Sequence, residues 1–121
     1  MEEERLKPMI SVIIPLYKGK KYIPQILNMM AQNSRRLKSA SMEVVFINDY
    51  PEEKIELDTC NCTYSVKIFV NDRNMGIHKS RIRGIELCSG DYILMLDQDD
   101  VIADNYLENQ YSKMGSSDWI V

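Results

Sequence analysis

Histidine, cysteine and long apolar runs are scarce in this 121-residue sequence, and each shortage excludes a class of function. His78 is the single histidine, and one histidine makes neither a catalytic triad nor a histidine metal cluster. Cys60, Cys62 and Cys88 form no CxxC pair, so we expect a reduced, intracellular chain without a thiolate metal site. No stretch approaches the roughly 20 apolar residues of a membrane helix, and the charged residues 1–5 do not resemble a signal peptide. These absences predict a cytoplasmic protein, with membrane association of a longer chain left open.

The sequence also has no excess of positively charged residues. The chain carries 15 Lys and Arg against 18 Asp and Glu, which gives a formal net charge of -3. A protein that binds a nucleic acid polymer needs clustered Lys and Arg against the phosphates, so we expect no such partner. Hydrophobic residues make up 45% of the chain and charged residues 27%, as in ordinary soluble domains. At this length we expect one domain over residues 1–121.

Apolar runs alternate with helical periodicities along the chain. Apolar, β-branched runs predict strands at residues 10–17, 42–47, 64–70 and 92–96. Helical spacing predicts helices at residues 22–33 and 77–87, and a third helix that is capped by Asp104 and runs to about residue 114. Pro24 suits the first turn of the first helix, and Gly90 suits the end of the second. The alternation predicts an α/β fold: an open, mostly parallel, Rossmann-like sheet with helices on both faces.

The segments between these elements are predicted as loops. Residues 35–38 form a basic linker, and residues 50–61 form a loop with room for one short helical turn. Residues 119–121 predict a strand that begins where the sequence stops. We therefore expect the chain to be the truncated, N-terminal portion of a longer domain.

Polar and acidic residues follow each predicted strand. The strand at 92–96, apolar on both faces and therefore expected in the centre of the sheet, ends on Asp97, Asp99 and Asp100. The other strand ends carry Pro15, Leu16 and Tyr17, then Asn48 and Asp49, then Asn71 and Asp72. The carboxyl ends of parallel strands meet at one edge, where ligands of such sheets bind. Four polar strand ends at one edge predict a binding site.

The three carboxylates after residue 96 repel one another unless a positive charge lies between them. Asp97 and Asp99, two positions apart on extended backbone, can face the same way and hold Mg²⁺ or Mn²⁺ together with a bound phosphate. Arg81 is expected to face this site, whereas Lys79 and Arg83 are expected to point to solvent. The alternative is a solvated acidic turn that caps the next helix.

Four motifs, in this order and spacing, resemble the GT-A fold glycosyltransferases of family 2. They are SVIIPLY at 11–17, EVVFIND at 43–49, NMG at 74–76 and GDYILMLDQDD at 90–100. The resemblance covers the chain from about Met9 to its end. It departs from the family pattern at Tyr50 and Pro51, where the family has Gly-Ser, and at Ile82, where it has Asn.

The resemblance implies transfer of a sugar from a nucleotide-diphosphate donor to an acceptor hydroxyl, with Mg²⁺ or Mn²⁺ bound through a DxD-type motif. It assigns nucleotide binding to Pro15, Leu16, Tyr17, Asp49, Arg81, Asp97 and Gln98, and metal binding to Asp97 and Asp99. The acceptor would be a saccharide or a lipid-linked molecule, and the mechanism inverting. The catalytic base would lie outside this chain, so we expect the chain alone to bind donor without transferring sugar.

Two other functions stay open. A phosphotransfer domain also has aspartates at strand ends, but a phosphatase needs its Asp-x-Asp after an early strand and a receiver needs acids after its first strand, where Pro15 stands. A non-catalytic nucleotide-binding module would keep the site without the reaction.

Overall fold

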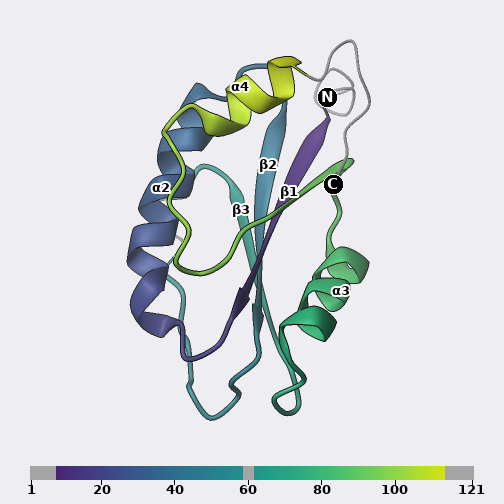
Figure 1. Cartoon of the computed structure of the whole chain (residues 1–121). Helices are drawn as coiled ribbons and strands as arrows, with labels where there is room; N and C mark the ends of the chain where they lie inside the picture. Colours follow the sequence, from purple (N-terminus) through teal and green to yellow (C-terminus); the bar gives the residue numbers. More distant parts are fainter. Residues whose placement is uncertain (1–7, 59–61, 114–121) are drawn as a thin grey trace.

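The computed structural model describes residues 8–58 and 62–113, and its centre is a four-stranded sheet (Figure 1). In spatial order the strands are β3 (Ser65–Val70), β2 (Ser41–Asn48), β1 (Met9–Leu16) and β4 (Tyr92–Met95). Every neighbouring pair is parallel, so all four strands end at the same edge of the sheet. The bounds of the strands agree with the sequence-based prediction to within one residue.

Helices cover both faces of this sheet, as the alternation of strands and helices predicted (Figure 1). The short 3-10 helix η1 (Lys20–Tyr22) leads into α2 (Ile23–Arg36), which shares one face with α4 (Tyr106–Lys113). The other face is covered by α3 (Ile77–Leu87), whose bounds are those predicted. Within the described residues, no helix has the length and apolar character needed to cross a membrane.

Strand β1 supplies the core on both faces because successive strand residues point in opposite directions. Its even-numbered residues lie in the main core beneath α2: Ile10, Val12, Ile14 and Leu16. Phe46 of β2 belongs to the same core. Ile13 packs with Val45 and Ile47 beneath α3. Gly84 of α3 lies so close to Ile13 that a Cβ would overlap that side chain, which lets the helix approach the sheet. Close packing on both faces holds the strand ends in fixed positions.

The predicted central position of β4 is wrong. In the described part of the chain β4 pairs with β1 alone and lies at the edge of the sheet. Its residues are apolar on both faces because Tyr92 and Leu94 pack on the main core, while Ile93 and Met95 pack on the core beneath α3. Layers on both faces can therefore make an edge strand apolar throughout.

Two helix boundaries also differ from prediction. Arg35 and Arg36 were expected in a linker, but they form the last turn of α2, where positive charge interacts favourably with the helix dipole. Asp104 was expected to cap the last described helix, but this helix begins at Tyr106, so Asn105 directly precedes it. The predictions for residue 114, for a strand at 119–121 and for Cys60 lie outside the described residues.

Candidate functional site

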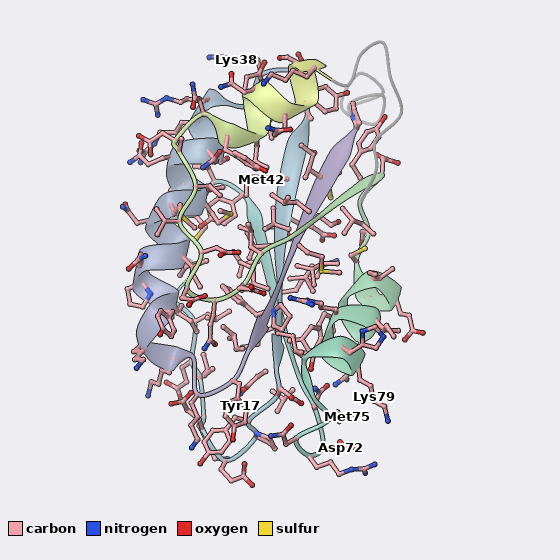
Figure 2. All side chains as sticks on the ribbon, viewed as in Figure 1. Tyr17, Lys38, Met42, Asp72, Met75 and Lys79 are labelled. Carbon is pink, nitrogen blue, oxygen red and sulfur yellow. The ribbon has the colours of Figure 1, made fainter. Side chains whose placement is uncertain are left out.

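A cavity of about 420 Å³ opens at the carboxyl ends of the strands. It lies where the strand order reverses, since β2 flanks β1 on one side and β4 flanks it on the other. Figure 2 shows Tyr17 and Met75 at this end of the molecule, well away from Lys38. The lining residues come from the end of β1, from the first half of α3 and the loop before it, and from the segments that follow β1, β2 and β4: Pro15, Leu16, Tyr17, Asp49, Asn74, Gly76, Ile77, Ser80, Arg81, Asp97, Gln98 and Asp99.

The structure therefore brings the residues predicted for the site into one cavity. Pro15 and Leu16 are buried in its wall at the end of β1, and Tyr17 is 44% exposed beside them. Two other acids expected at this edge, Asp72 and Asp100, are not among the residues that line the cavity, and Asp72 is exposed. The contacts that each predicted residue would make with a ligand stay predictions.

The acidic residues after β4 form a closed turn. Asp97 N donates a hydrogen bond to Asp100 Oδ2 (2.8 Å), and Asp100 N donates to the Asp97 carbonyl (3.0 Å). The turn gathers carboxylate oxygens of Asp97, Asp99 and Asp100 within 4.8 Å of one another. Carboxylate oxygens are the ligands preferred by Mg²⁺ and Mn²⁺, so the donor set fits the predicted ion.

Arg81 balances part of this negative charge. Its Nη2 donates to Asp97 Oδ1 at 2.8 Å, and both side chains are partly exposed, at 39% and 49%. An ion pair with this exposure contributes little to folding, about 0–1 kcal/mol. The guanidinium is therefore held toward the cavity, as predicted, and remains available to a bound anion.

Asp49 has a different environment from the acidic turn. It is 4% exposed, and its two carboxylate oxygens already accept three hydrogen bonds. Oδ1 accepts from Asn71 Nδ2 and Met75 N, both at 2.7 Å, and Oδ2 accepts from Gly76 N at 2.9 Å. These bonds fix the loop before α3, where Gly76 has a φ of 94°, a conformation that favours glycine. Asp49 thus shapes the cavity wall.

Arg83 does not point to solvent as predicted. Its Nη1 donates to the Val70 carbonyl at 3.1 Å and to Asn71 Oδ1. Asn71 is 1% exposed and in turn donates to Asp49 and to Ser80 Oγ (3.0 Å). No local sequence pattern predicted this network, although the polar pair Asn71 and Asp72 directly after β3 was a signal of it. Through Asn71, Arg83 thus stabilises two residues of the cavity wall, Asp49 and Ser80.

An aromatic pair borders the cavity on the β1 side. The rings of Tyr17 and Tyr50 meet edge to face, with centroids 5.3 Å apart. Lys18 Nζ lies 5.5 Å from the Tyr17 ring and 5.2 Å from the Tyr50 ring, within the range of cation–π attraction. Tyr50 departs from the family pattern, and here it packs against Tyr17.

A buried carboxylate also lies toward the amino ends of the strands, remote from the cavity. Glu43 of β2 is 1% exposed and accepts hydrogen bonds from Ser11 Oγ and Ser89 N, both at 2.6 Å. Lys67 Nζ lies 2.9 Å from its other oxygen. Burial raises the pKa of Glu43, but the hydrogen bonds from Ser11 and Ser89 and the Lys67 charge together bring the pKa below its ordinary value.

Comparison with protein families gives a match over most of the chain. A sequence model of the family described as "Glycosyl transferase family 2" matches residues 11–119. An uncharacterized glycosyltransferase from Haemophilus influenzae is 35% identical over 88% of this chain and 42% of its own length. Glycosyltransferase GlyA from Streptococcus pneumoniae is 25% identical over 87% of this chain and 15% of its own. The chain thus spans less than half the length of these relatives.

Solved structures share the fold. S. aureus TarS, in a structure of its residues 1–349, superposes with a TM-score of 0.70 at 24% identity, over 88% of this chain and 32% of that one. A structure of the same TarS segment in complex with UDP-GlcNAc has the same TM-score and identity, over 31% of its own chain. The similarity confirms the predicted GT-A type of α/β fold.

Proposed function

The chain belongs to glycosyl transferase family 2, and from that premise we propose that it is the donor-binding portion of a glycosyltransferase. The reaction would move a sugar from a nucleotide-diphosphate donor to an acceptor hydroxyl. The observation that carries the proposal is the cavity at the carboxyl edge of the sheet, which joins Tyr17 and Asp49 to Arg81 and the acidic turn. One side of this cavity is aromatic and the other is charged.

The charged side suits the diphosphate of the donor. Asp97 and Asp99 would hold Mg²⁺ or Mn²⁺, which when bound neutralises negative charge on the diphosphate leaving group. Arg81 would contact a phosphate oxygen from the other side, since its guanidinium already lies 2.8 Å from Asp97. The cavity thus offers cationic groups where the leaving group would gain charge.

The aromatic side suits the nucleobase. Tyr17 presents a partly exposed ring beside the buried Pro15 and Leu16, and base–aromatic stacking contributes about 1–3 kcal/mol. Oδ2 of Asp49 accepts one described hydrogen bond, from Gly76 N, and would have a lone pair left for a donor on the base. UDP is the first nucleotide to test, because the S. aureus TarS segment was solved in complex with UDP and with UDP-GlcNAc.

We assign no catalytic base to this chain. An inverting transferase needs a base within hydrogen-bond reach of the acceptor hydroxyl, and the relatives have more than twice the length of sequence matched here. The acceptor, a saccharide or a lipid-linked molecule, would therefore meet the site with the help of additional sequence. We propose that this chain alone binds donor without transferring sugar, and that it acts in the cytoplasm.

Titration calorimetry tests the proposal. We expect UDP or GDP to bind the chain in the presence of Mn²⁺ and to bind at least about tenfold more weakly without it, because the ion links the diphosphate to Asp97 and Asp99. Asp99→Ala should lose this ion dependence, whereas Asp104→Ala, at an exposed aspartate that does not line the cavity, should keep it. Nucleotide binding that is equally strong without the ion and in Asp99→Ala would contradict the proposal.

A further inference from the structure

We propose that Gln98 is a positioning residue that couples the ion-binding turn to the nucleobase side of the cavity. The inference rests on the proposed function and adds to it a specific linkage: an ion held by Asp97 and Asp99 would strengthen binding of the nucleobase, and the nucleobase would strengthen binding of the ion. Such coupling is reciprocal by thermodynamic necessity.

The first observation is a pair of hydrogen bonds, which we call the Gln98–Tyr17 amide pair. Gln98 Oε1 accepts from Tyr17 N at 2.9 Å, and Gln98 Nε2 donates to the Tyr17 carbonyl at 3.1 Å. Backbone pairing between β1 and β4 runs only as far as Ile13 opposite Met95, followed by one bond from Leu96 N to the Ile13 carbonyl. The side-chain amide of Gln98 therefore continues the pairing after the two strands separate.

The second observation is the space reserved for this side chain. Lys18 has a φ of 51°, which turns the chain after Tyr17 and brings Gly19 against Gln98. A Cβ at Gly19 would overlap Gln98 Oε1 and would also lie 3.0 Å from Leu16 Cδ2. Gly19 is buried and has an ordinary negative φ of -102°, so close approach to Gln98, rather than backbone conformation, favours glycine there.

The position of Gln98 within the turn explains why an ion would affect Tyr17. The two proposed ion ligands flank Gln98 in sequence, and the turn is closed by the hydrogen bonds between Asp97 and Asp100. Fixing Asp97 and Asp99 on one ion would fix the peptide from which Gln98 extends. The hydrogen bonds between Gln98 and the backbone N–H and carbonyl of Tyr17 would then hold the Tyr17 ring in one orientation against Tyr50.

Two variants remove the amide pair from opposite sides. Gln98→Leu keeps the approximate size of the side chain and removes both hydrogen bonds. Gly19→Ala keeps the glutamine, but the added Cβ displaces its side-chain amide. Gln25→Leu makes the same chemical change on an exposed residue of α2 and serves as the control. Circular dichroism and urea unfolding of all three variants check that each one keeps the fold.

The first measurement needs no metal. Hydrogen exchange of the Tyr17 amide, followed by NMR, should be about fivefold faster in Gln98→Leu and in Gly19→Ala than in the wild type, because one hydrogen bond contributes about 1 kcal/mol. The control should match the wild type. Unchanged exchange in both variants would show that the amide pair does not hold Tyr17, and would overturn the inference.

The second measurement is the coupling itself, with uridine and Mg²⁺ as probes. Uridine has no phosphate, so the direct link between the ion and a diphosphate is absent, and the comparison among variants isolates the part of the ion effect that depends on Gln98. We expect Mg²⁺ to raise uridine affinity about fivefold in the wild type and in Gln25→Leu, and to leave it unchanged in Gln98→Leu and Gly19→Ala. Equal ion effects in all four proteins, or none in any while UDP still requires the ion, would overturn the inference. Failure of UDP itself to bind with Mg²⁺ or Mn²⁺ would instead overturn the proposed function.

Discussion

Two kinds of carboxylate occur at the ends of the strands, and they differ in how fully their oxygens are occupied. Glu43 and Asp49, near opposite ends of β2, are almost completely buried and accept hydrogen bonds on both oxygens. Asp97 and Asp99, after β4, are exposed and border the cavity. The described contacts of the Asp97 carboxylate are those with Arg81.

The difference separates carboxylates that stabilise the fold from carboxylates whose oxygens are open to an ion. A buried carboxylate is tolerated only when hydrogen bonds and charges compensate its desolvation, and those partners leave few sites for a ligand. An exposed carboxylate needs no such compensation and keeps its lone pairs. Residue type and strand position alone would have grouped Asp49 with Asp97, whereas burial divides them.

The largest effect on the free energy of unfolding is expected for Glu43→Ala. The change leaves the buried Ser11 hydroxyl and the Ser89 N–H without their acceptor, so we expect a loss of about 3 kcal/mol. Urea unfolding measures it, with Glu86→Ala at an exposed position of α3 as the control. A loss no greater than that of the control would show that the buried carboxylate contributes no more to stability than an exposed one.

A somewhat smaller loss is expected for Asp49→Asn, about 2 kcal/mol. Whichever way the asparagine amide turns, its NH₂ group must face one of the N–H donors that Asp49 now accepts from. Nucleotide affinity should fall as well, since the loop before α3 forms part of the cavity. Urea unfolding and calorimetry test the two effects separately, and unchanged stability would show that the hydrogen bonds to Asp49 do not stabilise the fold.

Acid should weaken the fold through Glu43. Its pKa lies below the ordinary value of 4.5 in the folded protein, so its contribution is fully present above pH 4.5 and is lost as the pH falls through the folded-state pKa. Urea unfolding between about pH 6 and pH 3 should therefore show a steeper loss of stability in the wild type than in Glu43→Gln, which has no proton to gain. Parallel pH profiles would contradict this assignment.

The smallest effect on stability is expected for Asp99→Ala. Its carboxylate is exposed, so the free energy of unfolding should change by no more than about 0.5 kcal/mol. Removing one of three mutually repelling carboxylates can even stabilise the turn slightly. Urea unfolding in the absence of divalent ions is the measurement, and a loss comparable to that of Glu43→Ala would place Asp99 among the structural acids.

Local patterns were sufficient to predict the strands and α3, because apolar runs and helical spacing determine which segments become buried. They also predicted which strand ends would gather, since parallel strands share one carboxyl edge. The sequence could not show that Arg83 would reach Asn71, or that Gln98 would pair with Tyr17, because these contacts join residues on separate elements. Neither could it show that β4 would lie at an edge while packed on both faces.

The pairing of β1 with β4 also determines when the cavity can form. Tyr17 and Gln98 are 81 positions apart, whereas β1, β2 and β3 follow one another in sequence and in space. Closing so long a loop has a high entropic cost, and contacts between distant residues form slowly. A growing polypeptide that has reached only β3 can align three strands but has no acidic turn. The pocket can therefore be complete only after the chain has been extended through β4 and the acidic turn.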